Sequence, residues 1–252
     1  YGLDVNPMAV ELARLALWIH TFVPGLPMSN LDHGLVNANS LTGVGTIDEA
    51  LDALQPRRQP GEMSLFDEIL TDQLESSKTL LVDLANASEA NKAEVEEGSR
   101  LLAQAREAAG TARQIFDAAV AARIGAIDLG AIFDRDSLNR LISRPEVGET
   151  AQHLQPAHMP YLFPEVFQRK RGGFDVLLGN PPWEKMKVEE RIWWGTRLPG
   201  LARGMTQAER IPALAAFRAS RPDLEAEYIA DVARVGAMNQ VIKSGPFKLG
   251  SG

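Results

Sequence analysis

The sequence lacks several features that mark other classes of protein. It contains no cysteine among its 252 residues, which excludes a disulfide scaffold, a thiolate zinc site and a cysteine nucleophile. The four histidines are scattered without the spacing of metal ligands, at His20, His33, His153 and His158. No apolar run approaches the roughly eighteen residues of a membrane span, and the first residues do not have the pattern of a signal peptide. These absences predict a cytoplasmic protein with no membrane span and no bound metal.

The sequence also lacks an excess of basic residues. Its 26 Lys and Arg residues are outnumbered by 33 Asp and Glu residues, which gives a net charge of -7. A self-sufficient DNA-binding protein normally presents a basic face, so either the part that grips DNA lies elsewhere or the substrate is not DNA. Tyr1 begins inside a strand-like segment, and residues 248–252 stop in a loop. We therefore expect an internal piece of a longer protein.

The first forty residues have the pattern of an α/β fold. Residues 1–5 are predicted to end a strand, Asn6 is a good N-cap, and Pro7 suits the first position of a helix. That helix is predicted to continue to about His20, and residues 34–39 form a second strand. Strand, helix, loop and strand in this order are typical of a parallel sheet.

The composition changes over residues 45–172. Residues 57–61 are predicted to form a loop, and residues 64–127 are rich in helix-forming residues with apolar positions at helical spacing. They predict two or more long helices, arranged as an antiparallel hairpin that turns near residues 85–91. A short helix over 131–143, a loop over 152–164 and a short helix through Phe167 are predicted to follow.

The strongest strand signal is the apolar run over residues 173–179, of the kind that lies inside a parallel sheet. Residues 180–183 follow it directly, and ligands of open α/β sheets bind at this end of a strand. Residues 184–243 are predicted to be mainly helical, with Pro212 and Pro222 at the starts of helices.

The residues after that strand suit chemistry on an exocyclic amine: Asn180, Pro181, Pro182 and Trp183. Such an amine is a poor nucleophile, because its lone pair is conjugated into the ring. An Asn oxygen and a backbone carbonyl held by two prolines can accept its hydrogens and localise the lone pair. An aromatic ring beside them offers a surface on which a flipped-out base stacks. The alternative is a proline-rich turn with Trp183 in the core, which the preceding strand makes less favoured.

Two further segments fit a nucleotide site. Asp4 lies at the end of an early strand before a helix, where α/β folds hold ribose hydroxyls. Asn39 follows the second strand, where a polar side chain suits the amine of an adenine, with Leu41 against the ring face. Each segment also has a plain structural interpretation, since Asp4 favours a helix N-terminus and a polar turn often ends a strand.

Three segments in this order resemble the Eco57I-like DNA adenine methylases of restriction-modification and related phage-defence systems. They are GLDVNPMAVELARLALWI at 2–19, NANSLTG at 37–43 and FDVLLGNPPWE at 174–184. The resemblance implies an α/β fold, a partial Rossmann-like methyltransferase core with a long α-helical insertion that begins with an LFDEIL-like word at 65–70. It places the cofactor side at 1–44, the insertion at 45–172, and the catalytic strand with the following helices at 173–252.

The resemblance also implies the activity and its residues. The methyl donor is S-adenosylmethionine, and the acceptor is adenine N6 in double-stranded DNA. Asp4, with Val5 beside it, is implied to bind the cofactor's ribose, and Asn39 with Leu41 its adenine. Residues 180–183 are implied to hold the target adenine. A DNA recognition domain is implied to lie outside the sequence, and the insertion is a candidate surface for a protein partner.

The sequence departs from the family pattern at several points. Trp183 stands where Tyr or Phe is commoner, and Asn39 replaces a frequent Asp. The glycine-rich cofactor loop that precedes the first segment in the family is absent, so we expect residues 1–252 alone to bind cofactor weakly and to be inactive. Two alternatives stay open: methyl transfer to another planar nitrogen (cytosine N4, an RNA guanine amine or a protein glutamine amide), or a non-catalytic scaffold subunit.

Two further clusters carry weaker signals. The cluster over residues 168–171, in which Gln168 precedes three basic residues, suits a phosphate, although a solvated helix end fits it better. Trp193 and Trp194 suit a wedge against DNA, although packing under the last helices fits them better.

Overall fold

The computed structural model describes residues 1–21, 31–56, 64–87, 91–130, 132, 134–179, 187–198, 200–201 and 204–244. The chain divides into two compact units, which are taken in turn. The first comprises Tyr1–Leu177 with Val241–Gly252, and the second comprises Leu178–Gln240.

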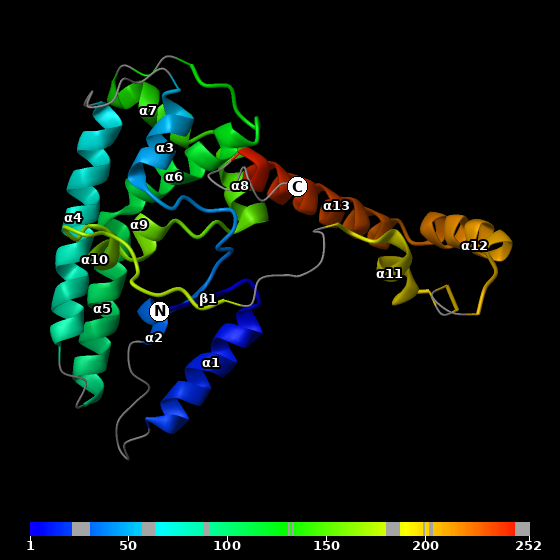
Figure 1. Cartoon of the computed structure of the whole chain (residues 1–252), viewed down its shortest axis with the longest axis horizontal. Helices are drawn as coiled ribbons and strands as arrows, with labels where there is room; N and C mark the ends of the chain where they lie inside the picture. The colour runs from blue at the N-terminus through cyan, green and yellow to red at the C-terminus, as the bar shows by residue number, and fades with distance from the viewer. Residues whose placement is uncertain are drawn as a thin grey trace. The chain divides into compact units, whose positions relative to one another are not determined.

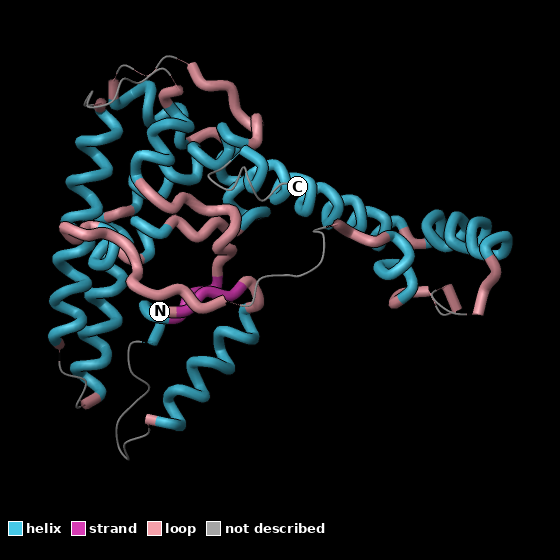
Figure 2. The backbone as a smooth tube through the Cα atoms, viewed as in Figure 1, coloured by secondary structure: helices cyan, strands magenta, loops and turns pink. Residues whose placement is uncertain are grey.

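The first unit begins with a strand–helix–strand arrangement, as the sequence predicts. Strand β1 (Gly2–Asp4) is followed by helix α1 (Pro7–His20), the short helix α2 (Leu31–Gly34) and strand β2 (Leu35–Asn37). The two strands pair in parallel, with Gly2 opposite Leu35 and Asp4 opposite Asn37. Figure 2 shows this pair in magenta beside α1.

Helix α1 begins where the sequence predicts because Asn6 caps it. The Asn6 side-chain oxygen accepts from the backbone N–H of Met8 at 2.9 Å, which satisfies one of the donors that a helix start leaves unpaired. Arg14 fastens the helix to the sheet, since its guanidinium donates to the Leu35 carbonyl at 2.7 Å. Val10 is the residue of this helix that is buried.

A layer of helices follows, and its first part is the predicted hairpin. Helices α4 (Leu65–Asn86) and α5 (Lys92–Ala108) lie side by side (Figure 1). Ser64 and Asp67 form a capping box at the start of α4, with the Ser64 N–H donating to the Asp67 carboxylate at 2.8 Å. The core between the two helices holds Leu81, Leu84, Leu102 and Ala105. The hairpin prediction is confirmed.

Helix α6 (Gly110–Arg123) is the central helix of this layer, because residues 115–121 are all buried. It packs against α3 (Ile47–Leu54), α4, α7 (Arg135–Ile142) and α8 (Pro145–Leu154). Arg123 joins α6 to α3 through an ion pair with Glu49 at 2.6 Å. Its other terminal nitrogen donates to the Glu49 carbonyl at 2.9 Å, so the charge of this buried guanidinium is paired.

The end of the layer differs in part from the prediction. The loop predicted over 152–164 is wrong at both ends, because α8 continues to Leu154 and α9 (Met159–Leu162) occupies part of it. Pro145 and Pro160, each at the start of its helix, show why: proline suits the first turn. The short helix through Phe167 is confirmed as α10 (Pro164–Phe167). The loop predicted over 57–61 lies outside the described residues.

The strand predicted over residues 173–179 is wrong in this structure. The segment has no strand pairing, and Val176, Leu177 and Leu178 are 73%, 82% and 95% exposed. A strand needs a neighbour to pair its backbone groups, and in the part of the chain that the structure describes the sheet contains β1 and β2 alone. The start of the segment is held differently, since Phe174 packs against the rings of Phe163 and Phe167.

The second unit is helical, as the sequence predicts. It contains α11 (Glu190–Gly195), α12 (Gln207–Ser220) and most of α13 (Pro222–Ser244). Pro222 begins α13 as predicted, but Pro212 lies inside α12. Helix α12 begins earlier because Thr206 and Glu209 form a capping box, with the Glu209 carboxylate accepting from the Thr206 N–H at 2.9 Å.

Candidate cofactor site

The two strands bring the predicted cofactor residues to one edge of the sheet. Because the strands are parallel, their carboxyl ends lie together, with Asp4 opposite Asn37. The Asn37 amide donates to the Asp4 carbonyl at 2.9 Å, and the Ala38 N–H donates to the same carbonyl at 3.1 Å. The first and second sequence segments, about 35 residues apart, therefore meet at the edge where ligands of α/β sheets bind.

Asp4 presents part of its carboxylate to solvent. Its Oδ1 accepts from the Asn6 N–H at 2.7 Å, which fixes the side chain against the start of α1. Its Oδ2 accepts no hydrogen bond from any residue that the structure describes. An exposed, oriented carboxylate with one open oxygen fits the paired hydroxyls of a ribose. Val5 beside it is 55% exposed and offers apolar surface at the same edge.

The turn after β2, residues 39–44, is here named the cofactor turn. Asn39 is 6% exposed, and its side-chain oxygen accepts from the Leu41 N–H at 3.0 Å. Asn39 therefore builds the turn from within, a local use of its oxygen that the sequence did not indicate. Ser40 is exposed and Leu41 half-buried, so these two residues form the outer surface of the turn. An apolar side chain there fits the face of an adenine.

The catalytic half of the predicted site cannot be placed beside the cofactor half. Asn180, Pro181, Pro182 and Trp183 lie outside the described residues. The structure thus brings Asp4, Val5, Asn39 and Leu41 together and leaves the four catalytic residues as a prediction.

A segment that no local pattern in the sequence predicts holds the cofactor turn. Residues 154–159, here named the clip, run between α8 and α9 and bond to the turn through their backbone. The Asn39 N–H donates to the Gln155 carbonyl at 2.7 Å, and the Ala157 N–H donates to the Asn39 carbonyl at 3.0 Å. Such contacts join residues more than a hundred positions apart. The one local signal in the sequence is Gly43, because a glycine in a turn can indicate that another segment lies close to its backbone.

The opposite end of the strand pair carries a second polar cluster. One oxygen of the Glu165 carboxylate accepts from the Tyr1 hydroxyl at 2.7 Å and contacts His33 Nε2 at 2.7 Å. Burial alone would raise the pKa of Glu165, but the hydrogen bonds from His33 and Tyr1 outweigh it and lower the pKa below its usual range. The same burial and the bond to Glu165 raise the pKa of Tyr1. This cluster fastens α10 to the start of the strands, away from the cofactor edge.

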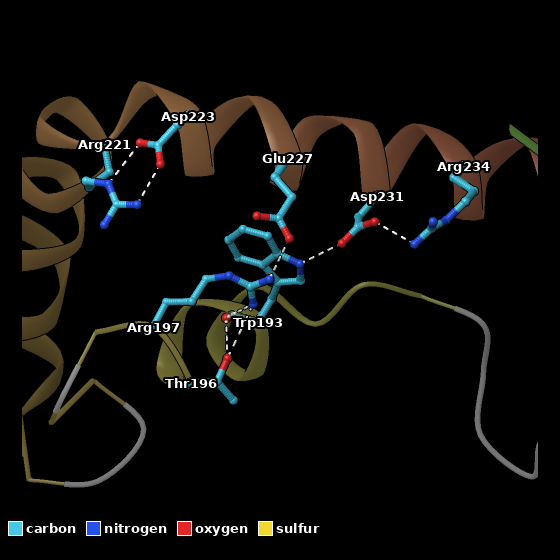
Figure 3. Close-up of polar contacts among 8 residues, drawn as sticks. All are labelled: Trp193, Thr196, Arg197, Arg221, Asp223, Glu227, Asp231 and Arg234. Carbon is cyan, nitrogen blue, oxygen red and sulfur yellow. Dashed lines mark hydrogen bonds and ion pairs between the residues drawn. The ribbon is translucent and has the colours of Figure 1, made fainter. Parts of the chain in front are cut away.

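In the two weaker clusters, Arg169 and both tryptophans make structural contacts. Arg169 donates to the Val166 carbonyl at 3.0 Å and to the Gly173 carbonyl at 2.6 Å, as a helix end requires. Trp194 is fully buried in the second unit. Its neighbour Trp193 has the Arg197 guanidinium 3.5 Å from the centre of its ring, and its indole N–H donates to Asp231 at 2.8 Å (Figure 3). The packing interpretation of both tryptophans is confirmed.

Comparison with known proteins identifies the family to which the sequence is similar. Residues 1–198 match the family model described as Eco57I restriction-modification methylase, a range that covers β1, α1, β2, the helical layer and the predicted catalytic residues. No curated protein and no solved structure matches the chain. Over the described residues, no helix is both long and apolar enough to cross a membrane. A family match over more than three quarters of the sequence is decisive, and the chain belongs to the Eco57I restriction-modification methylases.

Proposed function

We propose that this protein transfers a methyl group from S-adenosylmethionine to adenine N6 in DNA, as part of a restriction-modification or related defence system. Membership of the methylase family supports methyl transfer to DNA in general. The residue types at 180–183 support an exocyclic amine as the acceptor, and the resemblance carried by the three sequence segments supports adenine as the base. We further propose that β1, α1 and β2 belong to a Rossmann-like core, into which residues 45–172 are inserted.

The observation that carries the proposal is the pairing of Asp4 with Asn37. It joins the end of β1 to the start of the cofactor turn, so that an exposed carboxylate and an apolar surface lie at one sheet edge. S-adenosylmethionine combines a ribose with an adenine ring. Asp4 is suited to accept from the ribose hydroxyls, and Leu41 is suited to cover the ring.

The bound cofactor supplies an activated methyl group, and the chain supplies the positioning. The Asn180 side-chain oxygen and the Pro181 carbonyl accept hydrogen bonds from the two N–H groups of the target amine. These hydrogen bonds localise the lone pair on the nitrogen. Trp183 stacks on the flipped base and keeps it out of the duplex. Holding both reactants in line accounts for much of the rate enhancement, because the entropy of bringing them together is already lost on binding.

The test measures methyl incorporation by the full-length protein. Double-stranded DNA is incubated with labelled S-adenosylmethionine, and the methylated nucleosides are identified by mass spectrometry after digestion. We expect N6-methyladenine, and a loss of about 100-fold or more in Asn180→Ala. Asn86→Ala, which changes an exposed asparagine on α4, is the matched control and keeps full activity. Methyl groups on cytosine N4, or unchanged incorporation in Asn180→Ala, would refute adenine-specific transfer by residues 180–183.

A second arm of the same test addresses the cofactor. Asp4→Ala is expected to raise the dissociation constant of S-adenosylmethionine about 10-fold or more, because it removes a charged hydrogen-bond acceptor. Asp52→Ala on α3 changes an exposed carboxylate away from the sheet edge and is expected to have no effect. Equal affinities in all three proteins would rule out Asp4 as a cofactor ligand. A wild-type protein that binds no S-adenosylmethionine would instead favour the scaffold alternative.

A further inference from the structure

We infer that the helical insertion positions the cofactor turn through a buried His158–Asp117 pair, and that these two side chains are positioning residues for S-adenosylmethionine. The inference rests on the proposed function and deepens it, since it assigns a task to the region between the family's sequence segments. It is carried by three observations: the backbone bonds of the clip, the geometry of the pair, and the strained close approach of clip and turn.

The clip bonds to both ends of the cofactor turn. At the first end, Asn39 and Pro156 lie opposite each other in a parallel bridge. At the other end, the Met159 N–H donates to the Val44 carbonyl at 2.9 Å. Between them, the buried Thr42 hydroxyl donates to the Leu154 carbonyl at 3.0 Å. The path of the turn is therefore set by the clip as much as by β2.

His158 connects this contact to the core of the insertion. It is 2% exposed, and its Nδ1 accepts from the Val44 N–H at 3.3 Å. A backbone N–H is always a donor, so Nδ1 carries no proton and the hydrogen of the neutral ring is on Nε2. Nε2 then donates to the buried Asp117 carboxylate at 3.0 Å. Asp117 belongs to α6, the central helix of the layer, so one imidazole links that helix to the cofactor turn.

The charged groups around the pair are few. Arg113, one turn earlier on α6, lies 3.8 Å from the second oxygen of Asp117. The ring of Phe116 packs against that of His158, with centroids 5.5 Å apart. A buried carboxylate with a hydrogen-bond donor on one side and a cation on the other is held in one orientation, which in turn fixes the imidazole.

Clip and turn approach each other at the limit of what a backbone allows. A Cβ at Gly43 would lie 1.8 Å from the Ala157 carbonyl oxygen, so no other residue fits there without movement. Gln155, at the end of α8, has a left-handed backbone with φ of 45°, which is uncommon for a residue with a side chain. Strained residues persist where the surroundings over-determine them, and they cluster at functional sites.

The position of these contacts indicates a role in cofactor binding. The turn is joined through Asn37 to Asp4, and its outer surface is Ser40 with Leu41. A shift of the turn moves Leu41 relative to Asp4, and so alters the distance between the two groups proposed to bind adenine and ribose. Small displacements of positioning residues have large effects on ligands held at two points. The insertion is thus expected to affect cofactor affinity more than DNA affinity.

The experiment uses two substitutions of His158 in the full-length protein, with S-adenosylmethionine as the probe in calorimetry. His158→Gln places an amide near Nε2 and removes the acceptor for Val44. We expect it to raise the dissociation constant about 10-fold, equivalent to about 1.4 kcal/mol, with the KM for DNA unchanged. His158→Asn places an oxygen near Nδ1 but removes the donor to Asp117, so it is expected to restore the affinity only in part. Rescue of this kind separates a specific hydrogen bond from general packing.

The control is Leu102→Ala, which lowers stability in the α4–α5 core, a cluster that contains no residue of the clip or of the cofactor turn. It is expected to leave cofactor affinity unchanged. Thr42→Val, which removes the hydroxyl that contacts the Leu154 and Asn39 carbonyls, gives a milder change of about 3-fold and serves if His158→Gln does not fold.

The outcomes separate the two proposals. Wild-type protein that binds no cofactor refutes the proposed function, and the positioning role with it. The positioning role alone is refuted if wild-type protein binds cofactor no better than His158→Gln. Where that variant does not fold, the same comparison is made with Thr42→Val. An equal loss of affinity in Leu102→Ala would also refute it, because the effect would then follow stability.

Discussion

The cofactor turn and the segment over residues 173–179 form an instructive contrast. The turn is polar and rich in residues that favour loops, yet Thr42 and Val44 are fully buried and its backbone bonds to the clip at both ends. The segment carries the strongest strand signal in the sequence, yet Leu178 is 95% exposed. The apolar character of a run therefore does not decide whether it is buried.

The difference lies in the partners that each region has among the described residues. The clip supplies donors and acceptors to the turn from across the helical layer. The segment has aromatic contacts through Phe174 at its start, but no strand pairs with the residues that follow. A buried strand must satisfy its N–H and C=O groups on at least one side, so a run of this type needs a sheet neighbour before its side chains are covered.

The largest expected effect tests the first region. In Gly43→Ala the new Cβ would meet the Ala157 carbonyl at 1.8 Å, and backbone cannot swing aside as a side chain does. We expect the free energy of unfolding to fall by about 3 kcal/mol, measured by denaturant titration. Gly148→Ala on α8 is the control, since nothing lies within 4 Å of its Cβ position. It is expected to raise stability by about 0.5–1 kcal/mol, and a similar change at Gly43 would show that clip and turn are not in contact.

An intermediate effect tests how the other end of the strand pair is held. The pKa of Glu165 lies below its usual value, so this carboxylate contributes stability above about pH 4.5 and loses it as the pH falls through the lowered pKa. Glu165→Gln is expected to cost about 1.5 kcal/mol at pH 7, and the difference from wild type should vanish in acid. Glu107→Gln, at an exposed position on α5, should show no such dependence. A difference that stays constant with pH would mean that the ionised carboxylate does not bind His33 and Tyr1.

The sequence predicted those parts of the molecule whose signals are local. Asn6 and Pro7 mark the start of α1, and the spacing of leucines over 64–108 predicts the α4–α5 hairpin. The order strand, helix, loop and strand predicts the parallel pairing, which brings Asp4 to the end of β2.

The rest depended on contacts that no local pattern reveals. His158 looked like one of four scattered histidines, because its partner Asp117 is 41 positions away and the Val44 N–H is 114 positions away. The sequence predicts a helix start at Pro212, but the capping box at Thr206 fixes the start of α12 instead. The bond from the Leu41 N–H to the Asn39 side-chain oxygen inside the turn is likewise not predicted by a local pattern.

The smallest expected effect tests the second region and bears on the catalytic residues that follow it. Leu177 is 82% exposed, and substitutions at such positions usually change stability by less than about 0.5 kcal/mol. Leu177→Ser is therefore expected to leave the free energy of unfolding almost unchanged. Leu70→Ala, at a fully buried position on α4, should cost about 2–5 kcal/mol in the same assay and shows that a core change is detected. A loss above about 2 kcal/mol in Leu177→Ser of the full-length protein would contradict the exposed segment. It would favour the buried strand that the sequence predicts, with residues 180–183 at the carboxyl end of a sheet.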